Sequence, residues 1–175
     1  MKTALLIIDV QKALFKIPNE PIYQEKQLIS NIGGLIDKAR KSMTPIVYVQ
    51  HATQTGGFME PNTPGWEIHS VISPQKGDII VSKRTPDSFH ETVLKEELDK
   101  NGIGRLVITG LQTDYCIDTS CRRAFSLGYE AVLVSDAHST INSKVLDAEK
   151  IVAHHNNVLG SWFCELKSAE EIEFE

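Results

Sequence analysis

Short, uninterrupted runs of apolar residues alternate along this chain with segments in which apolar residues recur every three or four positions. An uninterrupted run is typical of a strand that is covered on both faces, as in a parallel sheet between helices. The pattern predicts strands at 4–8, 46–49, 79–82, 106–109 and 131–135, with a short last strand near 162–166. It predicts helices at 25–42, near 90–100, near 116–127 and near 145–157. This alternation predicts an α/β fold with a parallel sheet.

The segment 51–77 interrupts the alternation. It is rich in Gly, Pro, Thr and Asn, which predicts a long excursion over the surface with a single helical turn near 66–70. Loops of this length inside compact domains are usually functional. We therefore expect 51–77 to form much of the rim of a pocket.

A ligand-binding site is expected among the residues that follow the predicted strands. Parallel sheets bind ligands beyond the carboxyl ends of their strands, near the point where the strand order reverses. The residues in question are Asp9, His51, Lys83, 110–116 and 136–138. No G-x-G-x-x-G element follows the first strand, and Gly33–Gly34 lies inside a predicted helix, so the signal of a nucleotide-binding domain is absent.

Length and charge narrow the class of protein. The 175 residues fit one domain, which we expect to span 1–175. A formal net charge of −5 gives nucleic acid no general attraction, and no apolar run approaches the roughly 20 residues that cross a bilayer. The first residues lack the long apolar core and the cleavage site of a signal peptide, so we expect a cytoplasmic protein with its three cysteines reduced.

Cys116 is the first candidate for chemistry. A predicted strand is followed by a polar turn, and Cys116 then opens a predicted helix that Thr113 or Asp114 would cap. Unpaired N–H groups and the positive end of the helix dipole favour a thiolate there, so we expect the pKa of this thiol to fall below its ordinary value of about 8.5. Position alone leaves a buried structural cysteine open, and that is our interpretation of Cys121 and Cys164.

Asp9 and Lys83 are the next candidates, at the ends of the first and third predicted strands. A carboxylate there is a helix cap, a loop acceptor, or a group that takes the proton of a thiol and returns it to a leaving amine. A lysine there extends to solvent or pairs with a carboxylate, and Arg84 competes for that pairing. Paired with Asp9, Lys83 would keep the carboxylate charged and favour the thiolate. Asp9, Lys83 and Cys116 together indicate a reactive site more strongly than any one of them does alone.

Five segments resemble a known family: ALLIIDVQKALF at 4–15, IVYVQH at 46–51, 64–98, 108–138, and HHNNVL at 154–159. The G-x-x-T-D-x-C element at 110–116, with Asp9 and Lys83 upstream of it, is the specific part. On these residues the chain resembles the isochorismatase-like cysteine hydrolases. That family includes nicotinamidases, N-carbamoylsarcosine amidohydrolases and ureidoacrylate-type amidohydrolases, and the resemblance spans nearly the whole chain.

The resemblance implies a three-layer α/β/α sandwich with a six-stranded parallel sheet, a Rossmann-like arrangement. It implies a catalytic triad of Asp9, Lys83 and Cys116. It also implies a cis peptide bond between Leu111 and Gln112. That bond would aim the N–H of Gln112, together with that of Cys116, at one point as an oxyanion hole.

The chain departs from the nicotinamidases of this family at their metal site. Those enzymes bind a metal through an Asp-x-His element after the second strand and a later His. Here Gln50 and His51 occupy that place, and His69 is a lone remnant of the later ligand. Two histidines without a carboxylate make a poor site for a hard metal, so we expect no catalytic metal and no cofactor. His51 and His69 are then pocket groups or histidines satisfied within the fold.

The sulfur of Cys116 separates two activities within the family. Members that cleave the vinyl ether of isochorismate typically lack Cys at this position. Its presence favours covalent attack on a carbonyl, and thus hydrolysis of the C–N bond of a small amide or ureide through a thioester. Vinyl ether hydrolysis is the alternative within the family. A non-catalytic protein that binds a small molecule, or presents a reactive thiol, is the alternative from another class.

Four residues are expected to bind the substrate: Phe15, His51, Trp66 and Tyr115. The aromatic rings would supply apolar walls, although plain packing accounts for each of them as well. The expected partner is a small-molecule substrate, with neither nucleic acid nor a membrane. Oligomers are common among family members, which leaves a homodimer or a higher homo-oligomer open.

Overall fold

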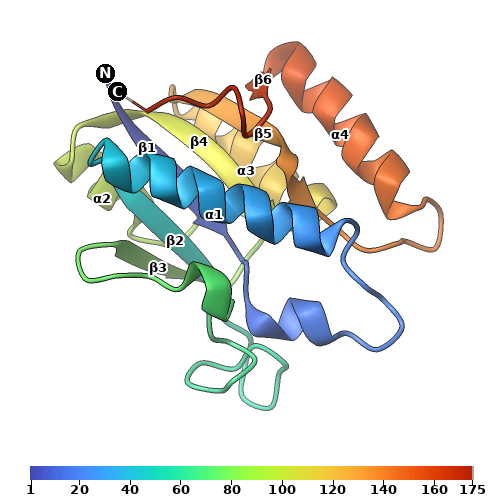
Figure 1. Ribbon diagram of the computed structural model, residues 1–175. Helices are drawn as coiled ribbons and strands as arrows, with labels where there is room; N and C mark the ends of the chain where they lie inside the picture. The colour runs from blue at the N-terminus through green and yellow to red at the C-terminus, as the bar shows by residue number, and fades with distance from the viewer. Residues whose placement is uncertain (175) are drawn as a thin grey trace.

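The computed structural model describes residues 1–174 and contains a six-stranded, wholly parallel sheet flanked by helices (Figure 1). The strands are β1 Lys2–Ile8, β2 Ile46–His51, β3 Ile79–Lys83, β4 Ile103–Leu111, β5 Glu130–Ser139 and β6 Glu165–Lys167. The longer helices are α1 Glu25–Lys41, α2 Leu94–Lys100, α3 Asp118–Ser126 and α4 Ala148–Trp162. Short helical turns lie at Lys12–Lys16, Ser70–Ile72 and Thr113–Ile117. The predicted α/β fold with a parallel sheet is confirmed; residue 175 lies outside the described residues.

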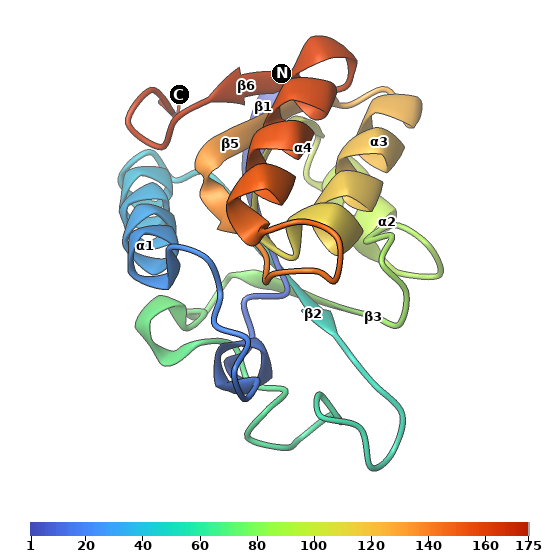
Figure 2. The same cartoon turned by 90° about the vertical axis from the view of Figure 1, so that its right-hand side faces the viewer.

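The central strand β1 supplies side chains to two cores. Leu5 and Ile7 are buried in the core formed with α1, whereas Leu6 and Ile8 are buried in the core formed with α2, α3 and α4. Figure 2 shows α1 on one side of the sheet and α2 and α3 on the other. Burial on both faces explains why the strands are uninterrupted apolar runs.

The strand order is β3-β2-β1-β4-β5-β6, so the direction of winding reverses between β1 and β4. Gly110 allows these two strands to approach closely at their carboxyl ends. Its φ is +126°, and a Cβ at this position would lie 2.0 Å from the carbonyl oxygen of Ile8. The segments that leave β1 and β4 therefore begin side by side, where sheets of this kind bind ligands.

Several predicted boundaries differ from the structure. The helical turn expected near 66–70 lies at Ser70–Ile72, and the helix expected near 116–127 is preceded by a π-helical turn that begins at Thr113. The last strand begins only at Glu165, because α4 continues to Trp162. Short apolar runs suit the end of a helix and a strand equally well, which is why the pattern misplaced that boundary. Within residues 1–174, none of the helices has the length and apolar character needed to cross a bilayer.

Candidate active site

The ammonium group of Lys83 is the centre of a buried polar cluster at the carboxyl ends of β1, β2 and β4. Its Nζ lies 2.6 Å from Asp9 Oδ2 and 3.1 Å from Cys116 Sγ. It also lies 3.0 Å from the carbonyl oxygen of Thr85 and 3.3 Å from His51 Nδ1. Three N–H groups thus face four acceptors. The side chain of Lys83 is fully buried, which a lysine tolerates only when it is paired.

Asp9 leaves β1 in the left-handed region, with φ +52°, and its N–H donates to the carbonyl oxygen of Val49 at 2.9 Å. An aspartate tolerates this conformation better than most residues, and such strain is common at functional sites. One carboxylate oxygen pairs with Lys83, while the buried Oδ1 has no hydrogen-bond partner among the described residues. The chain therefore holds an oriented carboxylate with one oxygen free to take a proton.

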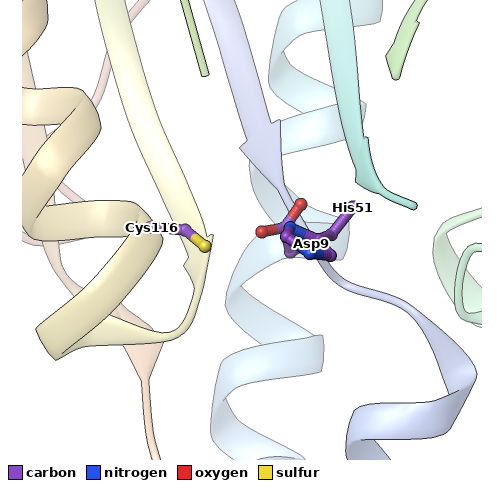
Figure 3. A group of neighbouring side chains, drawn as sticks. All are labelled: Asp9, His51 and Cys116. Carbon is purple, nitrogen blue, oxygen red and sulfur yellow. The ribbon is translucent and has the colours of Figure 1, made fainter. Parts of the chain in front are cut away.

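Cys116 lies in the π-helical turn and points toward Asp9, as Figure 3 shows. The pKa of its thiol is raised to about 12: burial is the largest cause, the nearby Asp9 carboxylate acts in the same direction, and Lys83 opposes both. The prediction of a lowered pKa was wrong because it considered only the helix terminus and not desolvation. At neutral pH the group is a thiol, so attack on a carbonyl requires that its proton leave first.

The turn before Cys116 contains a cis peptide bond between Leu111 and Gln112, as the resemblance implied. The carbonyl oxygen of Gln112 accepts from the N–H groups of Tyr115 and Ile117, each at 3.1 Å. No acceptor within residues 1–174 is found for the N–H of Gln112 itself. A free backbone donor beside a nucleophile is what an oxyanion hole requires.

Thr113 does not cap the following helix, contrary to prediction, but joins a second buried cluster. Its Oγ1 lies 2.9 Å from His138 Nδ1, and His138 Nε2 lies 2.8 Å from Asn156 Oδ1. Because the amide oxygen of Asn156 can only accept, Nε2 carries the imidazole proton and Nδ1 accepts from the Thr113 hydroxyl. Burial lowers the pKa of His138 to about 4, although the bond to Asn156 opposes that shift.

The other predicted cap, Asp114, instead accepts a hydrogen bond from Thr140 Oγ1 at 2.6 Å. Arg84, the competitor of Lys83, is exposed and lies outside the cluster. Gln11 was not among the predicted site residues. It is fully buried, accepts a hydrogen bond from the N–H of His51 and donates one to the carbonyl oxygen of His51. Its position, two residues after Asp9 at the end of a strand, is the sequence feature that could have indicated it.

Asp9, His51 and Cys116 offer ligand atoms that all lie within 4.8 Å of one another, as a metal site would require. The Nζ of Lys83 contacts all three side chains, so the ammonium already takes the place of a cation among them. Burial, followed by the charge of Lys83, lowers the pKa of His51. His69 contacts the ring of Phe15 instead, with centroids 4.8 Å apart, and is not in this group of ligand atoms.

A cavity of about 200 Å³ adjoins Cys116. It is lined by Asp9, Leu14, His51, Phe58, Met59, Pro86, Gln112, Tyr115 and Cys116. Of the four residues expected to bind the substrate, His51 and Tyr115 line this cavity, whereas Phe15 and Trp66 do not. The carbonyl oxygen of Trp66 accepts from Gln11 and Gln50, and Gln11 in turn bonds the backbone of His51, which lines the cavity.

Comparisons with known proteins identify the family. The sequence model of the isochorismatase domain matches residues 3–158. An uncharacterized isochorismatase family protein of Bacillus subtilis is 31% identical over 97% of this chain and 98% of that protein. A streptothricin hydrolase of Streptomyces noursei is 34% identical over 78% of this chain, which spans only 49% of that hydrolase.

Two further similarities involve a plant enzyme and a solved structure. Nicotinamidase 3 of Arabidopsis thaliana is 28% identical over 83% of this chain and 77% of that protein. The crystal structure of an isochorismatase from Pseudomonas putida KT2440 matches with a TM-score of 0.91 and 30% identity, covering 97% of this chain and 89% of that one.

Proposed function

This chain belongs to the isochorismatase family of hydrolases, and from that premise we propose that it hydrolyses the C–N bond of a small amide or ureide through a thioester on Cys116. The observation that carries the proposal is the position of the Lys83 ammonium, 2.6 Å from Asp9 and 3.1 Å from Cys116, beside a carboxylate oxygen that has no partner. Relatives named as nicotinamidase and ureidoacrylate amidohydrolase support the choice of a C–N bond.

The first half of the proposed reaction forms the thioester. Asp9 accepts the proton of Cys116, and the sulfur attacks the carbonyl carbon of the substrate. The N–H groups of Gln112 and Cys116 bind the oxygen that gains the negative charge. The C–N bond then breaks, and Asp9 returns its proton to the departing nitrogen, which leaves as ammonia or an amine.

The second half releases the acid. A water molecule attacks the thioester while Asp9 accepts one of its protons, and the C–S bond breaks. Cys116 recovers its proton from Asp9, and the product carries away the oxygen of the water. Lys83 keeps Asp9 oriented between these transfers, and its charge offsets the negative charge that develops on sulfur.

Replacing Cys116 with Ala tests this proposal. Ammonia release from a panel of small amides and ureides should fall to background in the variant, while its far-UV circular dichroism remains unchanged. Undiminished turnover by Cys116→Ala would contradict the mechanism, because the C–N bond would then break without a thioester on sulfur. A complete absence of amide turnover in both proteins would favour a non-catalytic role.

A further inference from the structure

The cavity beside Cys116 has mostly apolar walls. Leu14, Phe58, Met59 and Pro86 present apolar surface, and no lysine or arginine lines the cavity among residues 1–174. Its volume of about 200 Å³ lies below the 300–1,000 Å³ that is usual for drug-sized ligands. An acyl group bound here must therefore be compact and must find its contacts on apolar side chains.

The ammonium of Lys83, which contacts the lining residues Asp9, His51 and Cys116, is already engaged. Lys83 contacts four acceptors with three N–H groups, and two of these acceptors are Asp9 and Cys116. His51 accepts from this ammonium at Nδ1, which keeps the imidazole neutral. A carboxylate on the substrate would find no lysine or arginine among the lining residues and would lie near the negative charge of Asp9. Burying an unpaired charge is strongly unfavourable.

The loop between β2 and β3 holds the apolar wall in place. The N–H of Thr53 donates to the carbonyl oxygen of Met59 at 3.0 Å, and the N–H of Met59 donates to Thr53 Oγ1 at 3.2 Å. These two bonds close a short loop that fixes Met59, which is buried. Phe58, the preceding residue, is 58% exposed and lies at the mouth of the cavity together with Tyr115, which is 56% exposed.

We propose that the site selects uncharged carboxamides with a compact apolar acyl group, and that it excludes amides and ureides that carry a carboxylate. Phe58 and Met59 are the specificity-determining residues, because they supply the wall that the acyl group contacts. This inference rests on the proposed function, since it assigns a substrate class to the same cavity.

Two amides of matched shape test the proposal. The isopropyl end of 4-methylpentanamide and the carboxylate of succinamate have similar shapes, and the two molecules have the same number of non-hydrogen atoms. We expect kcat/KM for the neutral amide to exceed that for succinamate by about 100-fold or more, because the carboxylate would be buried without a partner. Comparable values, or a preference for succinamate, would overturn the proposal.

A charge placed at the mouth should change this preference. In Phe58→Arg the ratio of the two kcat/KM values should fall by about tenfold or more, since the guanidinium can pair with the carboxylate. Val71→Arg is the matched control: Val71 is 69% exposed and does not line the cavity, so the ratio should not change. An equal change in both variants, or no change in Phe58→Arg, would count against the assignment of Phe58.

Binding to Cys116→Ser separates this proposal from the proposed function. Calorimetry should show tighter binding of 4-methylpentanamide than of succinamate even if the native enzyme hydrolyses neither. That result would uphold the selectivity while the hydrolytic mechanism failed. Equal binding, tighter binding of succinamate, or binding of neither amide would reject the selectivity, whatever the turnover.

Discussion

Two buried polar clusters flank the turn at 112–116, and only one of them leaves a polar atom without a partner. The first, called here the reactive cluster, consists of Asp9, Lys83 and Cys116; it is charged, and Asp9 Oδ1 has no partner within residues 1–174. The second, called here the support cluster, consists of Thr113, His138 and Asn156.

The support cluster is neutral and satisfied throughout. Its bonds run from the Thr113 hydroxyl to His138, from His138 to Asn156 Oδ1, and from Asn156 Nδ2 to the carbonyl oxygen of Ser135 at 3.0 Å. A satisfied buried network fixes one conformation, whereas an unsatisfied buried atom costs stability unless it has another use. The comparison indicates that one cluster reacts and the other holds the turn in place.

The largest expected effect follows from removing the unpartnered carboxylate. In Asp9→Asn the amide cannot accept the Cys116 proton, so kcat for amide hydrolysis should fall by about 10³-fold or more. Steady-state ammonia release measures it, with Asp37→Asn, an exposed position on α1, as the control that retains activity. A modest loss in Asp9→Asn would assign the proton transfer to another group.

The pairing of Asp9 with Lys83 should appear as a loss of stability when only one partner is removed. Lys83→Met leaves a buried carboxylate unpaired, and urea unfolding should show a loss of about 3 kcal/mol. The double variant with Asp9→Asn removes both charges and should recover most of that loss. If single and double variants were equally unstable, packing of the lysine chain would be the cause instead.

The support cluster predicts a dependence of stability on pH. The pKa of His138 is about 4 in the folded protein, below the ordinary value of 6.5, so the unfolded chain binds its proton first as the pH falls. The contribution of His138 is fully present above pH 6.5 and is lost by pH 4, which amounts to about 3 kcal/mol.

Urea unfolding of native protein and of His138→Gln across this range measures that contribution. The variant should be less stable at pH 7, and its stability should fall less between pH 6.5 and pH 4. His155 and Asp136 exert smaller, opposite effects on the same pKa and are present in both proteins. If the stabilities of native protein and of His138→Gln fell equally between pH 6.5 and pH 4, His138 would not be the source of the pH dependence.

The smallest effect is expected at the end of the support cluster. Asn156→Ala leaves the buried Nε2–H of His138 without an acceptor and should cost about 2 kcal/mol of folding free energy. Asn157→Ala makes the same change at the next, exposed residue of α4 and should be neutral or slightly stabilising, because Ala has a higher helix propensity than Asn. Thermal unfolding compares the two variants; equal stabilities of Asn156→Ala and Asn157→Ala would show that the bond to His138 contributes nothing.

Much of this arrangement could be predicted because its causes are local. Uninterrupted apolar runs ending in Asp9 and Lys83 already indicate buried parallel strands with polar groups at their carboxyl ends. The π-helical start at Thr113 and the end of α4 at Trp162 were missed, because short segments suit more than one conformation.

The partners of Thr113 were beyond prediction for a different reason. His138 is 25 residues away along the chain, and nothing near either residue indicates the other. The same is true of Phe58 and Met59, which reach the cavity from a loop whose course depends on long-range contacts. Trp66 and Phe15 are aromatic residues of the kind that often forms pocket walls, but they do not line the cavity.

By itself, the sequence determined the α/β fold, the order of its elements and the residue types at the ends of the strands, because periodicity and turn composition act over a few residues. Only the tertiary structure decided that Lys83 lies between Asp9 and Cys116, that the thiol is protonated at rest, and that the cavity has no free cation among the described residues. These properties depend on burial and on distances between strands far apart along the chain.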